Sequence, residues 1–209
     1  MIFETNPILK EMLKIFTIIL LLFTVSPVHS ETNALGQQII IIAPEKNITA
    51  KNIAYKYSIW TKINSGYKMK ERPSRRIRNF ETWYSKRPEY VQRMLERSEK
   101  YLFYVVSQVE KRNMPMEIAL LPMIESAYNP LAKSKAKAVG MWQFIPSTGR
   151  LYGLQQDWWR DERQNVVEST DSALDYLERL YEEFGTWELA LAAYNAGEGR
   201  VGRTQKKNK

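Results

Sequence analysis

The chain has 209 residues, 44% of them hydrophobic and 26% charged, and a formal net charge of +8. This length and composition suit one folded domain with extra residues at an end, and they exclude wholesale disorder. Cysteine is absent and the single histidine is His29. Disulfides, Ser-His-Asp triads, Cys-His dyads and zinc sites of the usual kind are therefore excluded from the rest of the chain, where any acid or base must be Glu, Asp, Lys or Tyr. We expect neither a metal nor a cofactor.

Residues 1–30 have the pattern of a secretory signal peptide. Lys10 and Lys14 precede an uncharged apolar run at 15–25, and small residues lie near position 30. The run is short for a membrane span, and an uncleaved anchor is the alternative. An exported chain would not meet cytoplasmic nucleic acid. Its positive charge would suit an anionic envelope polymer or a membrane surface, unless it serves solubility alone.

Residues 31–97 are expected to form a lead and a helical extension. The run at 38–43 could be a short strand or a linker, and Pro44 ends it. A basic run at 72–78 follows several aromatic residues, which fits a solvated face or a docking surface. Apolar residues at helical spacing predict helices at 80–86 and 89–102.

Helices are also predicted through the rest of the chain. The strongly apolar run at 101–110 predicts one helix, and Asn113 and Pro115 separate it from the next. Pro122 should bend that next helix, and Asn129-Pro130 should end it. Thr170-Asp171 is then predicted to start a helix.

The helix that begins at Thr170 should end at Gly185. Its predicted apolar stripe consists of Ala173, Leu177, Leu180, Tyr181 and Phe184. A short helix at 187–194 should follow and end at 195–197. There is no strand pattern after residue 53 and no internal repeat, so the expected architecture is an all-α domain of short helices.

One carboxylate, Glu125, interrupts the apolar run at 118–128. On a helix it shares a face with Ile118 and Leu121, so it should turn toward the core. A buried carboxylate is costly unless it is neutralised, paired or used in chemistry. The sequence leaves open a structural Glu, bonded to backbone or to an Arg, and a functional one.

Three stretches, at 125–130, 134–148 and 192–197, contain more polar and loop-forming residues than packing requires. Their loop signals allow their polar groups to converge on one cleft. Gln143 lies among apolar neighbours, where its amide would bind a sugar or be satisfied by backbone groups. Asn195 follows Tyr194 near a helix end, and capping alone would explain it.

These stretches resemble the soluble-lytic-transglycosylase (SLT) domain of peptidoglycan-cleaving enzymes, particularly the membrane-bound lytic murein transglycosylases of the D type. The motifs are Glu125-Ser126, Gly140-Met-Trp-Gln143 and Ala193-Tyr-Asn-Ala-Gly197. The resemblance runs from about Trp60 to Val201. It implies a lysozyme-like all-α fold, similar to goose lysozyme, with a catalytic domain at 98–203, a basic tail at 204–209 and a missing C-terminal part.

The resemblance also implies roles for individual residues. Glu125 takes the place of the family's catalytic acid, and Ile145 takes the place of a residue that helps to wall the cleft. The expected substrate contacts are Ser126, Ser134, Met141, Gln143, Tyr194 and Asn195.

The implied reaction cleaves the MurNAc–GlcNAc β-1,4 bond of peptidoglycan and leaves 1,6-anhydro-MurNAc ends. A lysozyme-type hydrolase using water and a non-catalytic murein-binding remnant are the alternatives. The implied partners are glycan strands, without nucleic acid, and peripheral contact with a membrane is a further expectation. The chain is expected to be a monomer in the periplasm or cell envelope of a bacterium.

Overall fold

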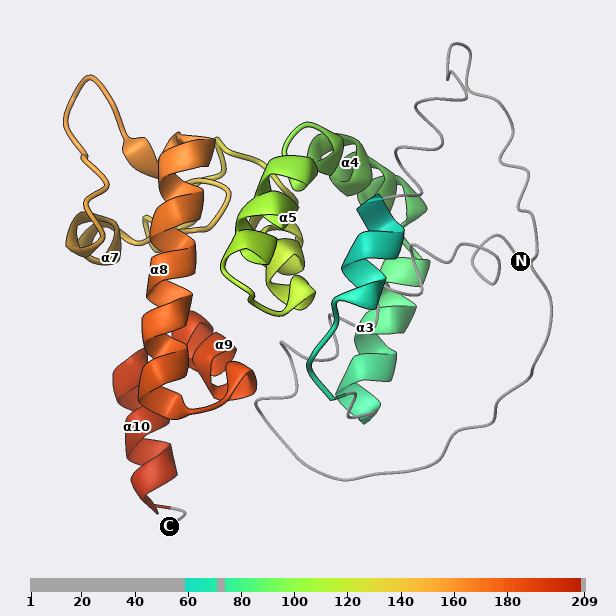
Figure 1. Ribbon diagram of the computed structural model, residues 1–209. Helices are drawn as coiled ribbons and strands as arrows, with labels where there is room; N and C mark the ends of the chain where they lie inside the picture. Colours follow the sequence, from blue (N-terminus) through green and yellow to red (C-terminus); the bar gives the residue numbers. More distant parts are fainter. Residues whose placement is uncertain (1–58, 71–73, 208–209) are drawn as a thin grey trace.

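The computed structural model describes residues 59–70 and 74–207, drawn in colour in Figure 1. The predicted signal peptide, the strand or linker at 38–43 and part of the basic run lie outside these residues. Within them the chain forms helices joined by turns, with isolated β-bridges and no β-strand. The all-α prediction is confirmed.

The first half of the described chain consists of a helix at 59–65, α3 (Arg75–Ser85), α4 (Pro88–Glu99) and α5 (Leu102–Lys111). α3 begins earlier than predicted because the side chain of Ser74 caps it by accepting from the backbone N–H of Ile77. The helix predicted at 89–102 ends at Glu99, and α5 begins as a separate helix.

Glu125 lies at the end of two consecutive helical elements, the 3₁₀-helix η2 (Met116–Leu120) and α6 (Leu121–Ser126). The single helix predicted to bend at Pro122 is thus two elements, which change from 3₁₀-helix to α-helix directly before this proline. Pro122 is in the first turn of α6, where its missing N–H costs nothing. α6 also ends before 129–130, because Ala127 and Tyr128 both adopt left-handed conformations with φ of 51° and 56°.

The second half contains α7 (Pro146–Leu151), the 3₁₀-helix η3 (Glu162–Gln164), α8 (Val166–Phe184), α9 (Trp187–Ala196) and α10 (Glu198–Lys207). The predicted start of α8 at Thr170 is wrong, because Asn165 caps the helix by accepting from the N–H groups of Val167 and Glu168. Gly185 ends α8 at φ 77°, as predicted, and residues 204–207 are the last turn of α10 rather than a tail.

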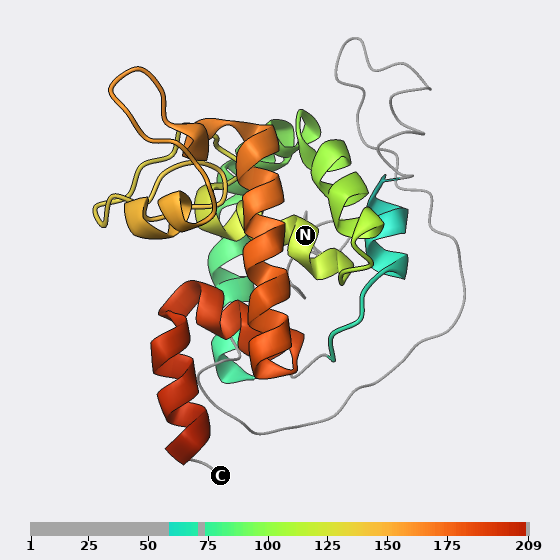
Figure 2. The same cartoon turned by 60° about the vertical axis from the view of Figure 1, so that its left-hand side comes forward.

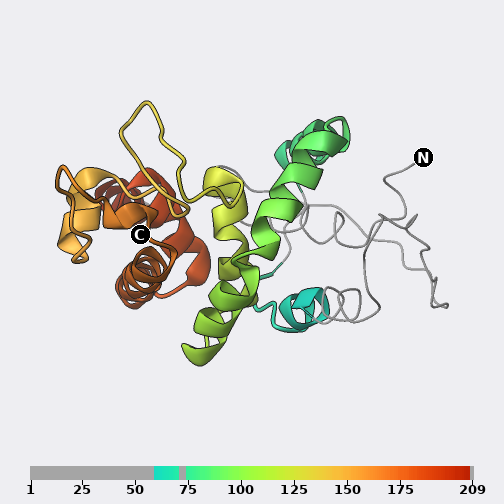
Figure 3. The same cartoon turned by 90° about the horizontal axis from the view of Figure 1, so that it is seen from above.

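α8 is the central element of this half. It packs along α9, and α9 packs against α10, as Figures 1 and 2 show. Ala173, Leu177, Leu180 and Phe184 are buried as predicted, whereas Tyr181 is exposed and stacks on Trp187. Seen from above, α7 to α10 lie on one side of α5 and α6, and the helix at 59–65 lies on the other (Figure 3).

One hydrophobic core connects the two halves. It contains Met94 of α4, Val105 of α5, Leu121 of α6 and Leu177 of α8, and a buried Trp142 from the loop between α6 and α7. At the edge of this core the end of α6 lies beside the end of α9, where the side chains of Glu125 and Asn195 are hydrogen-bonded. Among the residues that the structure describes, no helix combines the length and the apolar character needed to cross a bilayer.

Candidate active site

Glu125 occupies the last turn of α6. Ile118 and Leu121 are buried, and Glu125 is partly exposed at the edge of the core. Burial nevertheless dominates the pKa of its carboxyl, so Glu125 turns toward the core without being fully enclosed. Because the chain leaves the helix at Ala127 in a left-handed conformation, α6 stops one residue after it presents this carboxyl.

Burial raises the pKa of Glu125 to about 7, and a hydrogen bond with the side chain of Asn195 acts in the opposite direction. Removing water from a carboxylate disfavours its charged form, whereas a donated hydrogen bond favours it. At a pH near 7 both the protonated and the ionised forms of Glu125 are populated, so it can give a proton in one step and take one in the next.

The phenol of Tyr194 lies close to this carboxyl. Burial, and then the charge of Glu125, raise the pKa of Tyr194 well above its usual value, so it keeps its proton. Its hydroxyl donates to the backbone carbonyl of Trp142 across 2.7 Å. Tyr194 is thereby oriented by α9 and by the loop before α7 at once.

Two successive carbonyls of that loop join the three predicted motifs. The Ser126 hydroxyl donates to the carbonyl of Met141 at 2.8 Å, and the next carbonyl, of Trp142, accepts from Tyr194. The indole of Trp142 is buried and donates to the Thr170 hydroxyl of α8 at 3.0 Å. The end of α6, the loop and the end of α9 are therefore tied together beside Glu125.

Gln143 has a left-handed backbone, with φ 52°. Its side-chain nitrogen donates to the carbonyl of Gly140 at 2.8 Å and to that of Ala132 at 3.4 Å. Backbone carbonyls thus satisfy the nitrogen of the Gln143 amide, which was one of the two alternatives left open by the sequence. These bonds orient the amide oxygen, which remains able to accept from a sugar hydroxyl.

The remaining residues predicted to contact substrate differ in their exposure to solvent. Ser134 and Asn195 are exposed, and the Ser134 hydroxyl accepts from the N–H of Ala138 at 3.0 Å. The Ser126 hydroxyl is engaged with Met141, so it positions the loop. The side chain of Met141 is 0% exposed, so the direct contact with substrate predicted for it is wrong for this structure; it belongs to the core.

Comparison with known proteins agrees with this geometry. The sequence profile of the transglycosylase SLT domain matches residues 105–209. The chain belongs to the transglycosylase SLT family. It is 46% identical over 159 residues to "Membrane-bound lytic murein transglycosylase D" of Escherichia coli K12, which covers 76% of this chain and 35% of that protein.

Two shorter similarities point the same way. A "Putative tributyltin chloride resistance protein" of an Alteromonas species is 48% identical over 106 residues, 50% of this chain and 51% of that protein. "Soluble lytic murein transglycosylase" of Salmonella typhimurium is 36% identical over 84 residues, 37% of this chain and 13% of that protein. The chain thus spans about a third of the length of the E. coli relative.

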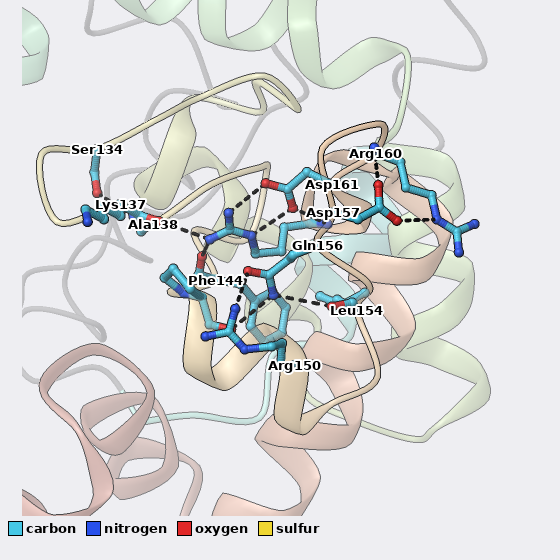
Figure 4. Close-up of polar contacts among 12 residues, drawn as sticks. Ser134, Lys137, Ala138, Phe144, Arg150, Leu154, Gln156, Asp157, Arg160 and Asp161 are labelled. Carbon is cyan, nitrogen blue, oxygen red and sulfur yellow. Dashed lines mark hydrogen bonds and ion pairs between the residues drawn. The ribbon is translucent and has the colours of Figure 1, made fainter.

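Sequence reasoning missed an important residue of this SLT domain, Arg163. Its buried guanidinium pairs with Asp161 at 2.6 Å and donates to the backbone carbonyls of Lys137 and Phe144, each at 3.0 Å. Figure 4 labels these three partners. Arg163 therefore holds both ends of the segment 137–144, the part of the loop that carries Gln143. The sequence offers no signal for this, because an Arg in a polar stretch is usually solvated.

Gly140, the glycine of the second motif, lies very close to the backbone of Arg163. Gly140 has φ 87°, and a Cβ added there would lie 1.7 Å from the carbonyl oxygen of Arg163. Any other residue would collide with backbone and adopt a strained conformation. Gly140 thus lets the loop lie directly against the backbone of η3.

The same reasoning also missed Glu117, a second carboxylate at the head of the apolar run. It is 1% exposed and accepts from the backbone N–H groups of Lys68 and Met69 at 3.0 and 2.9 Å. Its position directly before Ile118 was a usable signal. Its partners come from a segment far away in sequence and could not be anticipated.

Proposed function

We propose that this chain is a lytic transglycosylase that cleaves the MurNAc–GlcNAc β-1,4 bond of peptidoglycan and leaves 1,6-anhydro-MurNAc ends. The observation that carries the proposal is a carboxyl, Glu125, with its pKa raised to about 7 by burial at the meeting point of three SLT motifs. Membership of the SLT family supports the same reaction.

In the first step the protonated form of Glu125 donates its proton to the glycosidic oxygen as the bond to C1 of MurNAc breaks. A carboxyl whose pKa lies near the working pH is well suited to this role. Tyr194 stays neutral beside it, and its bond to the Trp142 carbonyl keeps it in place. Gln143 presents its amide oxygen to the sugar.

In the second step the carboxylate of Glu125 accepts the proton of the MurNAc C6 hydroxyl, whose oxygen bonds to C1. The sugar closes into a 1,6-anhydro ring, the proton is back on Glu125, and no water is consumed. Most glycosidases need two carboxylates to complete their cycle. Here burial and the Asn195 hydrogen bond, rather than a second carboxylate, set the pKa of Glu125.

We place the catalytic domain at 98–203, with residues 31–97 as its helical extension. The signal-peptide pattern at 1–30 supports action in the periplasm or cell envelope, and the net charge of +8 supports peripheral attraction to an anionic envelope surface. Glycan strands are the proposed partners of a monomeric enzyme.

The test is the digestion of purified sacculi by the chain and by its Glu125→Gln variant, with products identified by mass spectrometry. We expect anhydro-muropeptides from the unaltered chain and none from the variant. Products with reducing ends would identify a hydrolase instead. Binding to sacculi without any product would identify a murein-binding protein.

A further inference from the structure

The turn at 155–162, between α7 and η3, carries two neighbouring tryptophans in open solvent. Trp158 is 80% exposed and Trp159 is 77% exposed, and their ring centroids are 3.6 Å apart with 31° between the ring planes. Single exposed apolar side chains are normal in soluble proteins, but adjacent large aromatic rings that form one surface usually mark a binding site.

The turn holds its shape without these rings. The Asp157 N–H donates to the Arg160 carbonyl at 3.0 Å, and the Asp157 carboxylate accepts from the N–H groups of Trp159 and Arg160 at 2.8 and 2.9 Å. At its base, the N–H of Gln155 donates to the Glu162 carboxylate at 2.7 Å. The tryptophan side chains contribute to none of these bonds, so the fold alone does not explain their presence.

This tryptophan turn is fastened to the loop beside the active site. Asp161, at the foot of the turn, binds Arg163, which in turn donates to the carbonyls of Lys137 and Phe144 (Figure 4). Ser134 and Gln143 belong to the same loop. The base of the turn that carries the exposed rings is therefore connected to the loop that contains Ser134 and Gln143.

We propose that Trp158 and Trp159 form a platform that binds pyranose rings of the glycan strand away from the bond that is cut. The proposal rests on the function proposed above. One face of a pyranose ring carries C–H groups, which suit the negative face of an aromatic ring. Rings already held in place lose little entropy on binding, so they contribute more affinity.

The charge of the turn favours this ligand over a membrane. The carboxylates of Asp157, Asp161 and Glu162 are paired with Arg160 and Arg163, so the turn carries no excess of positive charge. Interfacial tryptophans that bind anionic bilayers are normally accompanied by unpaired Lys and Arg, because the lipid surface is negative. A turn whose cations are already paired gains little from such a surface, whereas a neutral sugar face does not require positive charge.

The test measures binding separately from cleavage. In a Glu125→Gln background, Trp158→Ala/Trp159→Ala is compared with Phe103→Ala, which removes an exposed aromatic ring from α5. The ligand is peptide-free glycan strands. We expect the tryptophan variant to bind the strands about tenfold more weakly and Phe103→Ala to bind as before. The unfolding transition should not change, because Asp157 keeps the turn.

Equal affinity of the tryptophan variant and its parent for glycan strands would overturn the platform. So would loss of binding to vesicles of phosphatidylethanolamine and phosphatidylglycerol with strand binding unchanged, since the rings would then contact a membrane. The proposed reaction is judged separately, from the products of the unaltered chain. If the unaltered chain forms anhydro products and the tryptophan variant binds strands as tightly as its parent, the reaction stands and the platform is rejected. If the tryptophan variant binds more weakly but the unaltered chain forms no anhydro products, the platform stands and the proposed reaction is rejected.

Discussion

Glu117 and Glu125 are both removed from bulk water on consecutive helices, and burial raises the pKa of both. Their surroundings differ. Glu117 is completely enclosed and accepts backbone N–H groups from Lys68 and Met69, which tie a distant segment to η2. Glu125 is partly exposed and has the exposed side chain of Asn195 as its hydrogen-bond partner.

The comparison shows that burial alone does not identify a catalytic carboxyl. A carboxylate bonded to backbone donors in the interior cannot reach a substrate, and its acceptors are committed to the fold. A carboxyl at the surface of the core, with one side-chain donor, keeps a raised pKa and remains accessible. The distinction arises from tertiary structure, because the hydrogen-bond partners of both carboxyls come from segments distant in sequence.

Exchanging each carboxyl for an amide should separate the two roles. Glu125→Gln should lower the rate of sacculus cleavage by about 10²–10⁴-fold, the usual contribution of a general acid, with little change in stability. Glu117→Gln should instead reduce the free energy of unfolding by about 1–3 kcal/mol, because a neutral amide oxygen is a weaker acceptor and an NH₂ group would replace Oε2 beside the Lys68 N–H. Cleavage rates and denaturant unfolding of both variants check this, and a reversed pattern would contradict the assignment.

The loop that adjoins Glu125 can be tested by adding a single methyl group. Gly140→Ala should destabilise the protein by about 2 kcal/mol more than Gly153→Ala, because both glycines have positive φ but only the first meets backbone. Gly153 is the matched control, since nothing lies within 4 Å of its added Cβ. Thermal unfolding measures the difference, and equal effects would show that the close approach of Gly140 to Arg163 does not require a glycine.

Removal of one hydroxyl should have a smaller effect. Tyr194→Phe deletes the donor to the Trp142 carbonyl and should cost about 1 kcal/mol of stability, with a cleavage rate lower by about tenfold. Tyr181→Phe, on the exposed side of α8, is the control. The assignment fails if Tyr194→Phe has no larger effect on cleavage than Tyr181→Phe.

The smallest effect concerns pH. The Asn195 hydrogen bond favours the ionised form of Glu125, so Asn195→Ala should raise the pKa of Glu125 further. Since the proposed reaction starts from the protonated form, the fall in rate at high pH should move to higher pH in this variant. Rates measured from pH 5 to 9 check the sign, and a shift to lower pH would contradict it.

Much of the fold could be predicted from sequence, because α5, α8 and α9 have strong apolar patterns and α8 and α9 end at glycines. The starts of α3 and α8 could not, since their caps, Ser74 and Asn165, resemble ordinary polar residues until their hydrogen bonds are seen. The isolation of Glu125 among apolar residues drew attention to it but left a structural and a functional role open, and the resemblance to the SLT motifs indicated the catalytic role.

The rest of the site depends on contacts between distant segments. The burial of Met141 and the clamp at Arg163 arise where the loop before α7 meets the segment before α8. No local pattern encodes such a meeting. The role of Glu117 likewise depends on donors at residues 68 and 69, which three helices separate from it in the sequence.

The most direct test of the account is the titration of the Glu125 side-chain carboxyl, followed by carbon-13 NMR and assigned with Glu125→Gln. The structure predicts a midpoint near pH 7, because burial outweighs the Asn195 hydrogen bond. A midpoint near 4.5, the ordinary value for a glutamate, would show that Glu125 is solvated and ionised at neutral pH, and it would contradict its role as the proton donor.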